Sequence, residues 1–149
     1  MSGWVQPSRP ELRMPTANSS AGSVMPAELF AVGTRITGRL GWTHPDIAGF
    51  LAGAGLDVLD IPIGLAPRAL RDIEAGKAAG RFTVSDAEIA LSAATGGMLG
   101  LFRMRQRHPE RVTETTVDQL AEAGLRLLGV PADEAARLAA LPLPPIEAW

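Results

Sequence analysis

Residues 85–107 read SDAEIALSAATGGMLGLFRMRQR, and this stretch decides the fold. It contains no proline, and its apolar residues recur at three- and four-residue spacing, which predicts one long helix. Ser85 and Glu88 have the spacing of a capping box, and Val84 can pack on Ile89 as a hydrophobic staple. We therefore expect the helix to begin at Ser85.

Apolar residues lie on two opposite sides of this helix when each residue advances by 100°. A helix of this kind must be covered twice, and the three short helices expected ahead of it can hardly cover both sides. A second copy of the chain is the simplest cover. The bulky side consists of Leu91, Thr95, Met98 and Phe102, and the small side of Ile89, Ala93, Gly96, Gly100 and Met104.

Glycines inside the long helix favour the same interpretation. Each costs about 1 kcal/mol relative to alanine, so Gly96, Gly97 and Gly100 need a compensating reason such as close helix packing. Gly124, on the next expected helix, fits this explanation. The alternative is that these glycines mark a kink or bulge within the core of a single chain.

Further helices are expected on both sides of the long one, which Pro109 ends near Arg107. No strand pattern competes, so the sequence predicts an all-α fold. A bend is expected over residues 55–66, which include Gly55, Pro62 and Gly64. The expected helices are Pro26 to about Leu40, Pro45 to about Gly53, Ala66 to about Gly80, Glu114 to Leu128, and Ala132 to Leu141.

The first 25 residues differ in composition from the rest. Pro7, Pro10 and Pro15 precede a polar run over residues 16–23, which favours an extended or mobile segment. We therefore divide the chain into this segment, residues 1–25, and a helical domain over residues 26–149.

Composition limits the possible functions. The 149-residue chain is 46% hydrophobic and 20% charged, which suits one globular domain. Its net charge of −2 gives no general attraction for a phosphate backbone. The absence of cysteine excludes disulfides and thiolate chemistry, and no membrane span or secretion signal is visible, which together favour the cytoplasm.

Two runs, AAGRFTV at residues 78–84 and AATGGMLGL at residues 93–101, resemble the C-terminal domain of TetR-family transcriptional regulators. HPERV at residues 108–112 and LRLLGVP at residues 125–131 continue the resemblance, which covers about residues 26–141. It implies a helical bundle whose two long C-terminal helices pair with their copies in a four-helix homodimer interface. It also implies that the shorter helices enclose a cavity for a small effector.

The chain departs from the family at its N-terminus. A segment of 25 residues is too short for the usual three-helix unit that contains the helix-turn-helix. We therefore expect DNA contact only through a helix-turn-helix domain that is not present in this chain. A fragment of a longer regulator and a natural headless relative both remain open.

Candidate site residues follow from these patterns. The interface residues are the small side of the long helix, given above, with Val117, Leu120, Gly124 and Leu128. A small, largely apolar ligand is expected to contact Phe30, Trp42, Phe50, Leu51, Thr95, Met98 and Phe102. The alternative is that the large residues simply form the core and that the Thr95 hydroxyl bonds to its own helix.

Catalytic and metal sites are not expected. His44 and His108 each precede a proline at a helix boundary, which suits local capping or surface roles. Asp57 and Asp60 can form a carboxylate pair, but solvation in a loop explains them as well. We therefore expect no enzyme, cofactor or metal. The leading hypothesis is an effector-binding regulator core; a dimerising or ligand-binding module without DNA activity and a small helical enzyme are the alternatives.

Overall fold

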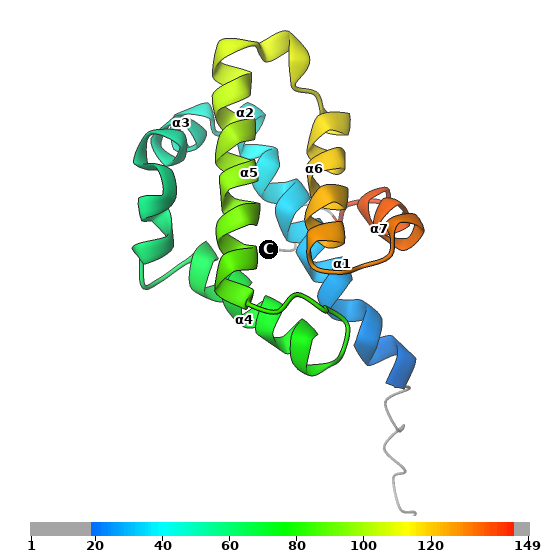
Figure 1. The fold of residues 1–149 in the computed structure, drawn as a ribbon. Coiled ribbons are helices and arrows are strands. Elements are labelled where there is room, and N and C mark those ends of the chain that lie inside the picture. The colour runs from blue at the N-terminus through cyan, green and yellow to red at the C-terminus, as the bar shows by residue number, and fades with distance from the viewer. Residues whose placement is uncertain (1–18, 145–149) are drawn as a thin grey trace, which may run out of the picture.

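The computed structural model describes residues 19–144, and the described residues contain helices and no strand (Figure 1). The expected all-α class is therefore confirmed. The α-helices are α1 (Ser19–Gly38), α2 (Leu40–Thr43), α3 (Pro45–Ala54), α4 (Leu65–Ala78), α5 (Ala87–Arg107), α6 (Glu114–Leu127) and α7 (Ala132–Ala139). Two 3-10 helices, η1 (Gly55–Asp60) and η2 (Pro109–Arg111), connect them.

Helix α1 begins earlier than the sequence predicts. It starts at Ser19 and contains Pro26, which was expected to open the helix. The burial of Ala27 and Ala31 fixes the part of α1 that follows Pro26 against the core, whereas the helical turns before Pro26 have no explanation in the local sequence pattern. The expected domain boundary after residue 25 falls inside α1, and residues 1–18 of the predicted N-terminal segment lie outside the described residues.

The start of α5 also differs in detail. Asp86 caps the helix, and its Oδ1 accepts hydrogen bonds from the backbone N–H groups of Glu88 (2.9 Å) and Ile89 (3.1 Å). The predicted cap at Ser85 is therefore wrong by one residue. The predicted staple is wrong too, because Val84 packs against the core whereas Ile89 is 69% exposed.

The core lies where α1 crosses behind α5 and α6 (Figure 1). A larger cluster joins α1, α4, α5, α6 and α7 and includes the fully buried Ile73, Leu125 and Leu138. A smaller cluster, formed by Leu101, Val112 and Val117, closes the end of the bundle near η2. Neither cluster contains a residue of α3 or η1. The side of α5 that faces these two elements is therefore not filled by the core and can form a cavity.

An arginine ties α1 to the C-terminal helices. Arg35 is only 5% exposed. Its Nε donates to Asp118 Oδ1 on α6 at 2.7 Å, and its guanidinium also donates to the carbonyl of Leu141, just after α7, at 2.5 Å. A buried charge with these partners fixes the position of α1, which forms one wall of the cavity described below.

Among residues 19–144, no single helix has both the length and the apolar composition to cross a membrane. Pro45–Asp60 and Leu65–Ala78 reach that length and composition only as a pair, with a bend of 56° between them.

Candidate functional site

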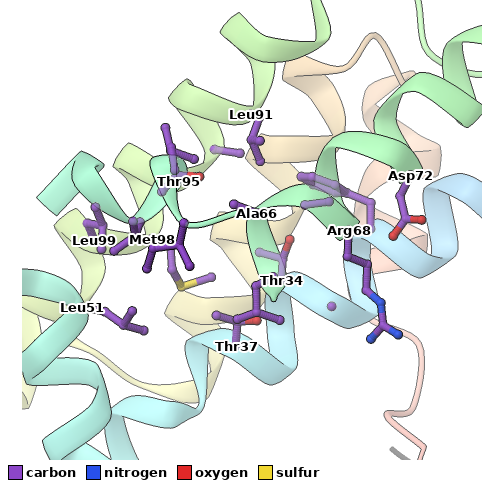
Figure 2. A pocket seen from close by; sticks show the side chains of 18 of the residues that line it. Thr34, Thr37, Leu51, Ala66, Arg68, Asp72, Leu91, Thr95, Met98 and Leu99 are labelled. Carbon is purple, nitrogen blue, oxygen red and sulfur yellow. The ribbon is translucent and has the colours of Figure 1, made fainter. Parts of the chain in front are cut away.

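A cavity of about 310 Å³ lies between α1, α5 and the chain from α3 to α4. Its volume falls at the lower end of the range for small-molecule pockets in proteins. Figure 2 shows side chains from α1, α3 and α5 converging on this space, with Met98 between Leu51 and Thr37. The wall on α5 consists of Leu91, Ala94, Thr95, Met98, Leu99 and Phe102, so the bulky side predicted from the sequence faces the cavity.

Three hydroxyl groups interrupt the apolar lining. Thr34 and Thr37 lie on α1, and Thr95 lies on α5. The hydroxyl of Thr43 donates to the carbonyl four residues earlier, at 3.2 Å. The three cavity hydroxyls, in contrast, form no hydrogen bond with any other described residue, so they are free to pair with a ligand.

Charged groups occur at the α4 side of the cavity. Arg68 and Asp72 are four residues apart on this helix, and both line the cavity. They form no ion pair with each other or with another described residue. Figure 2 shows the guanidinium of Arg68 directed away from Met98 and Thr95.

Five of the seven predicted ligand residues line the cavity: Phe30, Leu51, Thr95, Met98 and Phe102. The other two lie elsewhere. Trp42 packs in the smaller core cluster, where the Arg105 guanidinium stacks 4.0 Å from the ring centroid. Phe50 is 69% exposed on the outer side of α3. Neither can reach a ligand in this conformation, whereas a ligand role for the other five stays a prediction.

The sequence interpretation missed the α1 threonines and the wall formed by residues 58–65. Thr34 and Thr37 follow Phe30 at helical spacing, so the pattern places all three on one face of α1. Residues 58–65 had no periodicity that would show which side they present. Their contribution depends on how η1 folds back over α5.

The small side of α5 faces outward in the single chain. Ile89, Ala93, Gly96, Gly100 and Met104 are all exposed. A Cβ built on Gly96 or Gly100 would meet no atom within 4 Å. Packing within the described chain therefore does not explain these two glycines, although Gly97 packs closely on Leu120.

The α6 residues predicted for the interface need revision. Val117 and Leu128 are buried in the core of this chain, Leu120 packs on the smaller core cluster, and Gly124 faces Phe30. The periodicity identified an apolar face correctly but could not distinguish burial against α1 from burial against a second copy. The exposed positions of α6, which no part of the described chain covers, are Glu114, Thr115, Gln119, Ala123, Arg126 and Leu127.

Among the described residues, no group of three histidine or carboxylate side chains could hold a metal ion. His44 and His108 are both exposed at helix boundaries, as expected from the prolines that follow them.

Residues 25–141 match the family described as the tetracyclin repressor-like C-terminal domain. The chain belongs to this family. Among solved structures, the chain is similar to RolR without ligand, with 30% sequence identity and a TM-score of 0.67 over 86% of this chain and 66% of RolR. It is also similar to RolR in complex with resorcinol, with 28% identity and a TM-score of 0.65 over 86% of this chain and 69% of RolR.

The chain thus spans about two thirds of the length of RolR. A search of curated proteins found no significant match.

Proposed function

We propose that this chain is the effector-binding and dimerising core of a TetR-like transcriptional regulator. The observation that carries the proposal is the mainly apolar cavity against the bulky side of α5, in a chain that belongs to this family. A mainly apolar lining with a few hydroxyl groups is typical of a site that binds a small molecule.

The proposed effector is a small, largely apolar molecule with hydroxyl groups. The apolar walls favour a ring or an aliphatic body, and the free hydroxyls of Thr34, Thr37 and Thr95 can each donate or accept one hydrogen bond. The structure of RolR with resorcinol, a benzene ring with two hydroxyls, supports this class of ligand. Resorcinol is therefore the first probe to test.

The proposed dimer forms through the small side of α5 and the exposed positions of α6. Ile89 and Met104 offer exposed apolar surface, while Gly96 and Gly100 allow the backbone of a second helix to approach closely. An effector that binds the two dimer geometries with different affinity would shift the equilibrium between them. DNA contact is assigned to a helix-turn-helix unit and not to residues 25–141, which match only the C-terminal domain.

The proposal is tested by thermal unfolding of the chain with resorcinol, phenol and toluene. Ligand that binds only the folded state raises the unfolding midpoint, and a concentration one hundred times Kd adds about 2.7 kcal/mol to the free energy of unfolding. We expect resorcinol to raise the midpoint more than phenol and phenol more than toluene, because each hydroxyl can pair with a cavity threonine. Equal shifts for all three would contradict the role of the hydroxyls, and no shift would contradict the ligand class.

A further inference from the structure

The chain between α3 and α4 forms one wall of the cavity. We call residues 55–64 the lid segment; it consists of η1 and the connection that follows it. Val58, Leu59, Ile61 and Ile63 from this segment line the cavity. Figure 1 shows it along the outer edge of the molecule, away from α6 and α7. We propose that the lid segment turns about Gly55 and Gly64 and closes over the cavity when an effector binds.

Both ends of the lid segment have a backbone conformation that glycine alone adopts readily. Gly55 has φ 63° and ψ −145°, and Gly64 has φ 102° and ψ −140°. A Cβ built on either residue would meet no atom within 4 Å. The requirement for glycine is therefore one of backbone conformation and not of space, and glycine also lets the backbone at both ends of the segment change φ and ψ at little steric cost.

Apart from a backbone hydrogen bond from Gly55 N–H to the carbonyl of Leu51 in α3, apolar contacts link the lid segment to the described residues around it. No side-chain hydrogen bond or ion pair connects residues 55–64 to the other described residues, and no backbone hydrogen bond connects them to α1 or α5. Arg35 and Arg105, by comparison, each donate two hydrogen bonds to other segments of the chain. A segment attached in this way can move at low cost.

The apolar residues of the lid segment are largely uncovered. Ile63 is 79% exposed although it lines the cavity, and Leu56 and Ile61 are about half exposed. Contact with water is unfavourable for isoleucine and leucine side chains. Burial of these side chains against a bound apolar ligand is therefore favourable. Closure would bury Ile61 and Ile63 against the ligand and would slow its release. This inference rests on the proposed function in that the effector occupies the cavity.

The test uses the absence of cysteine from the chain, since a single introduced thiol is then the only reactive one. Ile63→Cys places it on the lid segment, and Phe50→Cys places a matched thiol on α3, outside the cavity, where the side chain is also exposed. The rate of thiol modification is measured with and without saturating resorcinol, whose binding is followed separately by calorimetry. We expect resorcinol to slow modification of Ile63→Cys by about tenfold or more and of Phe50→Cys by less than about twofold.

A second measurement works without ligand. Gly64→Ala in the Ile63→Cys chain penalises the observed open conformation, because alanine disfavours φ 102°. We expect slower thiol modification, by about threefold or more, in the free protein. Gly53→Ala is the matched control, since Gly53 lies in α3, has no positive φ, and would place its Cβ in open space.

The outcomes separate the lid from the proposed function. Because Ile63 lines the cavity, bound resorcinol itself shields a thiol at this position, so protection confined to Ile63→Cys supports both proposals only together with slowing by Gly64→Ala in the free protein. Protection without that slowing overturns the lid and supports the proposed function. Resorcinol binding that leaves the Ile63→Cys rate unchanged overturns the lid and leaves the proposed function intact. If resorcinol does not bind, the proposed ligand class fails, and the free protein decides: slowing by Gly64→Ala but not by Gly53→Ala supports the lid, and equal rates overturn it.

Discussion

The ring of Phe30 occupies the space that a side chain at position 124 would need. A Cβ built on Gly124 would lie 2.8 Å from Phe30 Cε1 and 3.0 Å from Cζ. Because Phe30 also lines the cavity, the contact between α1 and α6 sets the position of one cavity wall. Packing within the chain is thus sufficient to explain Gly124.

Gly124→Ala should destabilise the chain and weaken ligand binding together. The added methyl group overlaps the ring of Phe30, and overpacking of this kind costs about 1–3 kcal/mol. Urea unfolding measures the loss of stability. Gly53→Ala, whose Cβ meets nothing within 4 Å, should not lower the free energy of unfolding and should raise it by up to about 1 kcal/mol, because alanine is the better helix former. Equal effects of the two substitutions would show that Phe30 moves aside freely.

Asp118→Asn should lower the free energy of unfolding by about 2 kcal/mol. It removes the charge that pairs with the nearly buried guanidinium of Arg35, while the partial exposure of Asp118 softens the loss. Glu114→Gln is the control, because its side chain is 75% exposed and lies 3.6 Å from Arg39. That exposed pair should contribute less than about 0.5 kcal/mol. Equal losses in urea unfolding would rule out a special role for Arg35 in fixing α1.

Asp86→Ala should cost about 1 kcal/mol, because the carboxylate accepts hydrogen bonds from two backbone N–H groups at the start of α5. Ser85→Ala should be nearly neutral, since the Ser85 side chain does not cap this helix. The two variants are compared by urea unfolding. A larger loss of stability for Ser85→Ala than for Asp86→Ala would instead identify Ser85 as the cap, as the sequence pattern predicts.

Local patterns were sufficient to predict most of the longer helices and the two sides of α5. The spacing of Leu91, Thr95, Met98 and Phe102 placed all four on the side that now faces the cavity. Contacts between distant segments were not predictable in the same way. Trp42 packs against the smaller core cluster, which includes Val112 and Val117. These residues are about 70 positions away in the sequence, so the local pattern around Trp42 cannot predict the contact.

The same reason explains the revision on α6. Val117 and Leu128 form an apolar face with clear helical spacing, and either α1 or a second copy can cover such a face. The sequence does not show that α1 crosses there. The start of α1 was predicted wrongly as well, since Pro26 is a good first-turn residue but lies inside the helix.

Gly96→Leu and Gly100→Leu should split the proposed dimer. Each places a bulky side chain on the outer side of α5, where a partner helix is proposed to approach the backbone. Light scattering should give twice the chain mass for the unsubstituted protein and for Gly53→Leu, and the mass of one chain for the two α5 variants. A monomeric unsubstituted chain would remove the dimer from the proposed function.

Calorimetric titration with resorcinol tests the central claim, that this cavity binds the effector. We expect one site per chain, a loss of affinity of about tenfold or more in Met98→Trp, which fills the cavity, and a change below about twofold in Phe50→Ala, which lies outside it. Binding that survives Met98→Trp unchanged, or no binding to the unsubstituted chain, would contradict the account.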